Sequence, residues 1–364
     1  MIPFLAPLFY QCLAIFAALR HFRKRGARTH VDAISVLKPL CGLDPNTHEA
    51  FVSQIQQNYP EFEILFGVAD AQDPAAHEVQ RLQQQFPHAP IRLIVGTHPA
   101  PNGKVGVLMH LAKHARHPVW FVNDSDIKVD PHYLSKVAAP LADPENGVVT
   151  CLYRVKPHNL PAAWEALGIA TDFMPSTLVA QLIGVREFGL GSTLAFRAAD
   201  LQQAGGFAAL ADYIADDYQL AKRITGLGKR AVLSTYVVET SLAGATWVGV
   251  WRHQLRWART IRLSKGPAYL GLPIAHAGLW ALVAALCGKR RIALLLVGIR
   301  TTSAIISGGL VLRSPWMAVL SWLAPAWDLY SFAVWLASYA GRGVQWRGRV
   351  LTIGAHGRIS KPRA

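Results

Sequence analysis

The sequence predicts an α/β domain built on a mostly parallel sheet, flanked at both ends of the chain by apolar helices that cross a membrane. Two observations predict this fold class. Between about residues 30 and 240, short apolar runs alternate with polar helical stretches, a pattern typical of parallel sheets. Long apolar runs bordered by basic residues occupy the two ends, as in membrane proteins. With 364 residues, the chain is long enough for both parts.

The charge of the chain is concentrated at its two ends. Only 16% of its residues are charged, against roughly 25% in average globular proteins, yet the formal net charge is +15. Residues 1–30 hold five basic and no acidic residues, and residues 240–364 hold 16 basic residues and one acid, Asp328. Residues 31–239 hold 16 basic and 21 acidic residues. The high apolar content excludes a disordered chain, and the acidic middle argues against nucleic acid as a partner.

The first apolar run, 2–19, is long enough to span a bilayer, which takes about 20 residues. A signal peptide carries its positive charge before the apolar run. Here the positive charge follows it, in Arg20, Arg23, Lys24, Arg25 and Arg28. We therefore expect a transmembrane helix over residues 1–20 rather than a cleaved signal. The positive-inside rule then places residues from 30 onward in the cytoplasm.

The C-terminal membrane region, 268–340, contains three further apolar runs: 268–287, 292–312 and 315–340. The link 288–291 and the tail 341–364 are both basic, so both are expected on the cytoplasmic side. These expectations agree if the run 268–287, which contains a proline and a histidine, is re-entrant or lies at the interface. The chain would then cross the membrane three times.

A segment rich in tryptophan and arginine, 246–265, precedes this region. Its aromatic and basic residues alternate: Trp247, Trp251, Arg252, Arg256, Trp257, Arg259, Arg262 and Lys265. This composition suits an amphipathic helix in the headgroup layer, where the cations meet lipid phosphate. An ordinary basic surface helix is the alternative.

The central region, 30–240, divides into expected strands and helices. The strands are expected at 34–37, 63–70, 91–95 and 119–122, and the helices at 47–58, 75–86 and 104–116. Ligands of such sheets bind beyond the carboxyl ends of the strands. Asp70 and Asp124 both stand at such ends, which places two acids at the expected mouth of a site.

Two carboxylates follow the fourth expected strand, in Asp124-Ser125-Asp126. Where a strand ends and the chain turns, both can converge on one hard cation. Mg²⁺ or Mn²⁺ prefers oxygen ligands and keeps positions open for substrate phosphates. The pattern therefore predicts a holder for a metal and a diphosphate at Asp124 and Asp126, although many such pairs are solvated turns.

A second acidic pair, Asp216-Asp217, precedes the helical stretch 218–226. One of these acids could act as a catalytic base if it reached a nucleophilic hydroxyl. Alternatively, the pair only stabilises the helix through its dipole. The glycines in 189–193 and 205–207 indicate tight turns or close approaches of the backbone.

Together these residues resemble the membrane-bound ceramide glucosyltransferase family of inverting glycosyltransferases. The resemblance runs in order from about Ser35 to Trp257, and the ordered series is specific although each motif alone is weak. The matching segments are Ser35–Gly42, Asp44–Asn46, the strand ending at Asp70, Asn102–Lys104, Asp124–Ile127, Ala204–Phe207, Asp212–Tyr218 and His253–Trp257.

The resemblance implies a nucleotide-sugar-binding domain of the GT-A type and a role for each matching residue. Asp70 and Lys104 would lie near the nucleotide, Asp124 and Asp126 at the metal and diphosphate, and Asp217 would be the general base. Arg256 and Trp257 would close over the diphosphate and acceptor, as the end of a (Gln/Arg)-x-x-Arg-Trp motif. The sequence departs from this motif at its first position, which is His253. Histidine can still donate a hydrogen bond to a phosphate.

The resemblance also implies a single displacement with a UDP-sugar donor, Mg²⁺ or Mn²⁺, and a lipid acceptor in the bilayer. Asp217 would take the proton from the lipid hydroxyl, and the product would be β-linked. A bacterial branch that adds N-acetylglucosamine to a polyhydroxylated hopanoid is the closest match. This branch implies a multi-pass protein of the bacterial cytoplasmic membrane, with the catalytic domain facing the cytoplasm. Glucosylation of ceramide from UDP-glucose is the first alternative.

Other functions fit the sequence less well. A polysaccharide synthase needs more spans to enclose a polymer channel, and a dolichol-phosphate-type transferase lacks the opening and closing segments found here. A non-enzymatic membrane scaffold would tolerate replacement of Asp124, Asp126 and Asp217.

Overall fold

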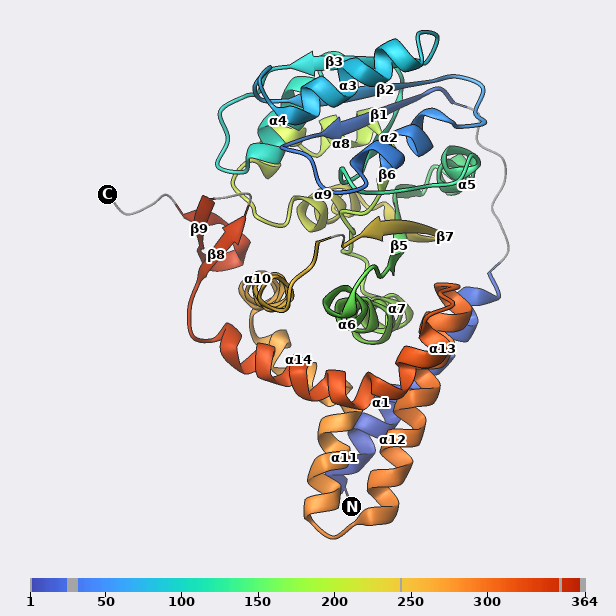
Figure 1. The fold of residues 1–364 in the computed structure, drawn as a ribbon, viewed down its shortest axis with the longest axis vertical. Helices are drawn as coiled ribbons and strands as arrows, with labels where there is room; N and C mark the ends of the chain where they lie inside the picture. The colour runs from blue at the N-terminus through green and yellow to red at the C-terminus, as the bar shows by residue number, and fades with distance from the viewer. Residues whose placement is uncertain (1, 25–31, 243, 347–348, 361–364) are drawn as a thin grey trace. The chain divides into compact units, whose positions relative to one another are not determined.

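The chain folds into two compact units. A computed structural model describes residues 2–24, 32–242, 244–346 and 349–360. The sheet unit comprises Arg25–Tyr153 and Arg186–Ser241, and the helical unit comprises Met1–Lys24, Arg154–Val185 and Leu242–Ala364. The elements of both are labelled in Figure 1.

The sheet unit is built on a seven-stranded sheet in the order β3-β2-β1-β4-β6-β5-β7. The strands are β1 (Ile34–Pro39), β2 (Phe62–Val68), β3 (Ile91–Val95), β4 (Val119–Val122), β5 (Asn146–Lys156), β6 (Leu194–Arg197) and β7 (Arg230–Ser241). The first four are parallel, and β6 is antiparallel to both β4 and β5. The expected mostly parallel α/β sheet is therefore confirmed, as are its first four strands.

The helices of the sheet unit are α2 (Thr47–Ile55), α3 (Pro74–Gln85), α4 (Gly103–Leu111), α5 (Tyr133–Ala138), α8 (Ala198–Gln203) and α9 (Asp216–Thr225). Side chains before two of them fix their first turns. Asp73 accepts from the Ala75 amide before α3, which also has Pro74 at its first position. Asn102 accepts from the Val105 amide before α4. Such caps satisfy amides that have no partner within the helix. The helix expected over 104–116 ends at Leu111, and the one expected over 47–58 ends at Ile55.

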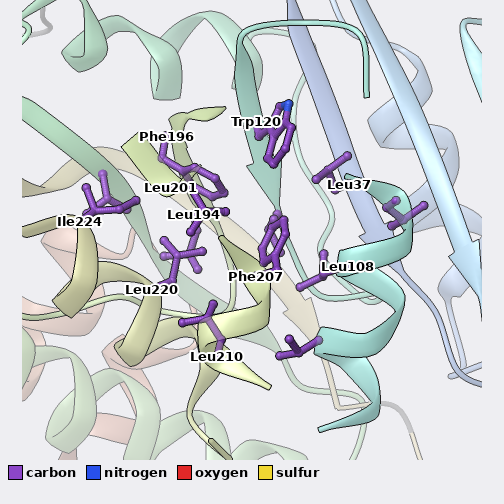
Figure 2. Packing of buried hydrophobic residues seen from close by; sticks show 14 of the residues in the cluster. Leu37, Leu108, Trp120, Leu194, Phe196, Leu201, Phe207, Leu210, Leu220 and Ile224 are labelled. Atoms are coloured by element: carbon purple, nitrogen blue, oxygen red, sulfur yellow. The ribbon is translucent and has the colours of Figure 1, made fainter. Parts of the chain in front are cut away.

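The core on one face of the sheet packs α4, α8 and α9 against β1, β4 and β6 (Figure 2). The Trp120 ring on β4 stacks parallel to the Phe207 ring with 6.0 Å between centroids. Leu108 on α4 and Leu220 on α9 are buried in the same cluster. Because both helices pack on one face, the first turns of α4 and α9 are held close to the carboxyl end of β4.

The helical unit contains the ends of the chain and an insertion from its middle. Its helices are α1 (Leu5–Phe22), α6 (Leu160–Gly168), α7 (Met174–Leu182), α10 (Trp247–Lys265), α11 (Ala277–Leu286), α12 (Arg290–Ala304), α13 (Met317–Leu320) and α14 (Ala324–Ser338). Turns of 3-10 helix cover Gly266–Ala275, and π-helical turns cover Ile169–Phe173 and Ile305–Val311. Within this unit α1, α11 and α12 pack side by side (Figure 1), through a cluster that includes Phe4, Ala281 and Leu296.

Two described helices, Leu5–Phe22 and Arg290–Val311, are long and apolar enough to cross a membrane. A third span results if Trp247–Ala275 and Ala277–Leu286, which meet at a 57° bend, are counted as one. The run 268–287, expected not to cross, is thus broken at His276, in keeping with either a broken span or a re-entrant loop. The run 315–340 divides into short helices, and α14 has 15 residues, fewer than the roughly 20 that a span needs. It is therefore not among the described candidate spans.

The segment 154–185 begins in the last three residues of β5 and ends before β6, and it belongs to the helical unit. From sequence, this segment is expected to belong to the domain 30–240. Its packing explains the difference. Arg300 of α12 donates to the Thr171 carbonyl across 2.6 Å. The Trp327 ring fills the space beside Gly168, so that a β-carbon at this position would collide with it.

The basic helix α10 matches the expected segment 246–265, but two of its arginines have partners in the chain. Arg259 donates to the Gly343 carbonyl across 2.5 Å, and Arg262 donates to the Gly341 carbonyl across 2.6 Å. The described part of the expected basic tail, 341–364, begins with these residues and contains a three-stranded antiparallel sheet, whose strands are β8 (Gly343–Trp346), β9 (Arg349–Ile353) and β10 (Ile359–Ser360). Arg25, Arg28, 347–348 and 361–364 lie outside the described residues.

Candidate active site

The loop after β4 carries the acids Asp124 and Asp126, and a buried lysine holds its start. Lys38, at the end of β1, is fully buried. Its Nζ donates to Asn123 Oδ1 across 2.9 Å and to the Asp124 carbonyl across 2.8 Å. Burial lowers the pKa of Lys38 to about 7, although Asp126 and Asp124 partly oppose this shift. The loop is therefore fixed by its backbone, and the Asp124 carboxylate is available for other contacts.

A second lysine, Lys104, joins Asp124 to the acidic pair at the start of α9. Its Nζ lies 2.8 Å from Asp124 Oδ1 and 3.4 Å from Asp216 Oδ2. Burial alone would lower the pKa of Lys104, but Asp124 and Asp216 more than compensate and raise it. The lysine therefore stays charged, and it reduces the repulsion among acids that belong to two separate segments.

Asp217 faces Asp124 across Gly191. A β-carbon added at Gly191 would lie 3.1 Å from Asp124 Oδ2 and 3.4 Å from Asp217 Oδ2. The Tyr218 amide donates to Asp217 Oδ1 across 2.7 Å, which leaves Oδ2 on the Gly191 side. Burial, followed by the charge of Asp216, raises the pKa of Asp217 to about 6, despite the opposing effect of Lys104. A carboxylate with such a pKa is well suited to accept a proton near neutral pH.

Asp126 lies at the edge of this group. Its carboxylate accepts a hydrogen bond from the Thr240 hydroxyl of β7. Burial and the neighbouring Asp124 charge raise the pKa of Asp126. Asp126 therefore contributes negative charge close to Asp124, while one of its oxygens is used within the sheet unit.

Asp70 stands at the end of β2, as predicted, and organises the turn that follows. Its Oδ1 accepts from the Gln72 amide across 2.9 Å, and its carbonyl accepts from the Asp73 amide. Among the described residues, no hydrogen bond or ion pair joins Asp70 to Asp124, Lys104 or Asp217. The structure thus brings the predicted residues Asp124, Lys104 and Asp217 together, with Asp126 at their edge, and the nucleotide contact of Asp70 stays a prediction.

The remaining predicted residues, His253, Arg256 and Trp257, lie on α10 in the helical unit. The ring centroids of His253 and Trp257 are 4.6 Å apart. His253 Nδ1 lies 2.5 Å from the buried carboxylate of Glu165 on α6. The first and last positions of the motif are therefore in contact on one face of α10.

Four residues of these clusters were missed or left without a role by sequence reasoning: Lys38, Gly191, Asp216 and Glu165. Lys38 could have been found from sequence, because it directly follows the apolar run 34–37 and a charge in a buried strand needs a partner. Gly191 had been noted only as part of a turn. No local pattern marks Glu165, whose partner lies far away in the sequence.

The site fits a divalent cation that is shared with a substrate. Among the described residues, no group of three or more His, Cys, Asp or Glu could hold a metal by itself. Asp124, however, is 46% exposed at its side chain and has one oxygen that Lys104 does not take. Mg²⁺ commonly binds through one or two carboxylates and takes its other ligands from phosphates and water. Asp124 and Asp126 meet that requirement.

Comparison with known proteins decides the family. A family model described as glycosyl transferase family 21 matches residues 1–359. The chain belongs to glycosyl transferase family 21. The predicted resemblance to ceramide glucosyltransferases is thereby confirmed at the level of the family.

Two curated relatives of this family 21 chain are ceramide glucosyltransferases of Caenorhabditis elegans. Ceramide glucosyltransferase 1 is 27% identical over 240 residues, which cover 65% of this chain and 51% of the relative. Ceramide glucosyltransferase 3 is 22% identical over 350 residues, which cover 92% of this chain and 75% of the relative. The chain thus spans about half the length of the first relative.

A solved structure supports the fold of the family 21 chain. The mannosyltransferase PcManGT from Pyrobaculum calidifontis, in complex with GDP-Man and Mn²⁺, is similar with a TM-score of 0.56 and 21% sequence identity. The match covers 92% of this chain and 96% of that one. The GT-A-type fold expected from the resemblance is confirmed.

Proposed function

We propose that this glycosyltransferase transfers a hexose from a UDP-sugar to a hydroxyl of a membrane lipid of the ceramide type. The observation that carries this proposal is the pair Asp124 and Asp217, whose carboxylates face each other across Gly191. Asp124, which contacts Lys104, is suited to bind the metal that accompanies a diphosphate. Asp217, whose pKa is raised, is suited to accept a proton from a hydroxyl.

The donor diphosphate would bind at the loop after β4. Asp124 and Asp126 would hold Mg²⁺ or Mn²⁺, and Lys104 would turn its ammonium towards the phosphates. The bound cation would offset negative charge on the departing UDP. A Mn²⁺ ion accompanies GDP-Man in the similar mannosyltransferase structure, which supports a metal here. Asp70 would contact the nucleotide, in accordance with its place after β2.

Asp217 would act as the general base. Its free Oδ2 would accept the proton of the lipid hydroxyl while that oxygen attacks the anomeric carbon. The sugar–oxygen bond forms as the bond to UDP breaks, and the proton ends on Asp217. Attack from the face opposite UDP inverts the anomeric carbon and gives a β-linked product. For α10, the family resemblance implies that His253 and Arg256 bind the diphosphate and that Trp257 contacts the acceptor.

A lipid acceptor is supported by the two candidate spans, because they would keep the enzyme at the membrane where the acceptor lies. The matched relatives are named ceramide glucosyltransferases, which favours UDP-glucose and ceramide over the hopanoid branch. N-acetylglucosamine transfer to a polyhydroxylated hopanoid stays a prediction of the sequence. We also propose that the sheet unit faces the cytoplasm, where UDP-sugars are made.

A donor and acceptor screen tests this function. Purified full-length protein in detergent would receive UDP-glucose, UDP-N-acetylglucosamine or UDP-galactose with Mg²⁺ or Mn²⁺. Each donor would be paired with ceramide or a polyhydroxylated hopanoid, and the lipid products would be identified by mass spectrometry. A hexose on ceramide is the expected product. A hexosamine on the hopanoid would overturn the ceramide assignment, and folded protein without any lipid product would overturn the proposed function.

A further inference from the structure

The carboxylate of Glu165 on α6 forms hydrogen bonds with two consecutive side chains of α10. Its Oε1 lies 2.5 Å from His253 Nδ1 and accepts from Gln254 Nε2 across 2.8 Å. The Glu165 side chain is 3% exposed, whereas that of His253 is 27% exposed. A buried carboxylate needs such donors, because an unpaired charge in the interior is costly.

This contact determines how the His253 ring can be used. The Nδ1–H group of His253 donates to the Glu165 carboxylate, so that Nε2 is the ring nitrogen that Glu165 does not contact. A doubly protonated ring would donate from Nε2 while Glu165 balances its charge. In metal sites, a carboxylate that accepts a hydrogen bond from the second ring nitrogen of a histidine fixes the ring orientation in the same way.

Neighbouring contacts hold the pair in place. The Trp257 ring lies 4.6 Å from the His253 ring and 5.2 Å from the Phe173 ring, measured between centroids. Asn159, at the start of α6, donates to the Ala245 carbonyl just before α10 across 2.9 Å. Its Oδ1 also accepts from the Ala162 amide. The helix that carries Glu165 is therefore attached to the beginning of α10, and the ring has little freedom to turn.

We propose that Glu165 is a positioning residue for the reaction, which orients His253 and balances its charge for the phosphate contact that the family resemblance implies for His253. The inference rests on the proposed function of His253. It explains how a histidine can serve where the resembling family has Gln or Arg. Those side chains donate without help, whereas a histidine donates from Nε2 in this orientation only when it is doubly protonated.

A double-mutant cycle between Glu165 and His253 tests the inference. Glu165→Gln keeps the shape and a hydrogen-bond acceptor but removes the charge. We expect it to lower kcat/KM for the UDP-sugar and to weaken UDP binding, measured by calorimetry, by about 10-fold. In a His253→Gln background the same substitution should change neither quantity more than about 2-fold, because a glutamine donates without a counter-charge. Equal effects in both backgrounds, or no effect in either, would overturn the inference.

The chain offers a matched control. His48 Nδ1 also lies 2.5 Å from a glutamate, Glu78, whose side chain is 11% exposed. Glu78→Gln should leave both quantities at the wild-type value. If Glu165→Gln does not fold, Glu165→Asp replaces it, since the shorter carboxylate keeps the charge but not its reach. A wild-type protein that binds UDP but forms no glycolipid would contradict the proposed function, while the UDP arm of the cycle would still test Glu165.

Discussion

Lys104 lies 2.8 Å from Asp124 and thereby connects the loop after β4 to the start of α9, where it also lies 3.4 Å from Asp216. The contact places one buried cation among several acids. Without it, the carboxylates of the two segments would repel one another. The same ammonium is close enough to meet a diphosphate that binds at Asp124. Lys104 therefore stabilises the site through Asp124 and Asp216, and under the proposed function it would also contact the bound donor.

Replacing Lys104 by methionine should both weaken donor binding and alter the base. The charge of Lys104 lowers the pKa of Asp217, so its loss raises that pKa further. We expect the acid limb of the kcat/KM profile to move to higher pH and UDP affinity to fall by about 10-fold or more. Lys104→Arg keeps the charge and should move the limb less. An unchanged limb in Lys104→Met would contradict the assigned contact.

The activity should rise with pH through about 6, where Asp217 loses its proton. Stability should respond in the opposite sense. Because the folded-state pKa of Asp217 is raised from its ordinary value of 3.8, the folded protein bears an unfavourable charge above pH 6. That cost is relieved as the pH falls from about 6 towards 3.8. A pH profile of wild type and Asp217→Asn measures both effects. The acid limb should disappear from the residual activity of the variant.

Gly191→Ala should reduce catalysis without unfolding the protein. The new methyl group would lie 3.1 Å from Asp124 Oδ2 and 3.4 Å from Asp217 Oδ2, beside both carboxylates of the proposed site. We expect kcat to fall by about 10-fold or more, since small misplacements of reacting groups have large effects. Gly298→Ala is the control, because a β-carbon there has no neighbour within 4 Å. Equal activity of both variants would show that the space beside Gly191 is not used.

Arg300 and Asp328 should stabilise the helical unit as a pair. Arg300 Nε and Nη2 lie 3.0 and 2.6 Å from Asp328 Oδ1, and both side chains are buried. Arg300→Met leaves the carboxylate unpaired, which costs about 3–5 kcal/mol in buried pairs. The variant should therefore melt at a lower temperature in detergent. Adding Asp328→Leu should recover much of that loss, and a double variant as unstable as the single one would contradict this account.

Much of the sheet unit could be predicted from sequence because its signals are local. The apolar strands β1 to β4, the acids after β2 and β4, and the acids before α9 all follow from short-range patterns. The side-chain partnerships were not predictable. Lys104 meets Asp124 and Asp216 only because α4 and α9 pack on the same face of the sheet, and such packing has no local signature.

The helical unit shows the same limit more strongly. The spans near Leu5–Phe22 and Arg290–Val311 follow from apolar length. From composition alone, the arginines of α10 were expected to contact lipid phosphate. In the structure, Arg259 and Arg262 donate to carbonyls at the start of the C-terminal segment. The segment 154–185 contains no long apolar run, so nothing in the sequence assigned it to this unit. Tertiary contacts determined both outcomes.

The most direct test of the central claim compares wild type with Asp217→Asn in glycolipid formation from UDP-glucose and ceramide. Asparagine keeps the size of the side chain but cannot take the hydroxyl proton. We expect the variant to bind UDP with wild-type affinity and to form product at least about 100-fold more slowly, the usual contribution of a general base. Glycolipid formation by Asp217→Asn at the wild-type rate would contradict the account.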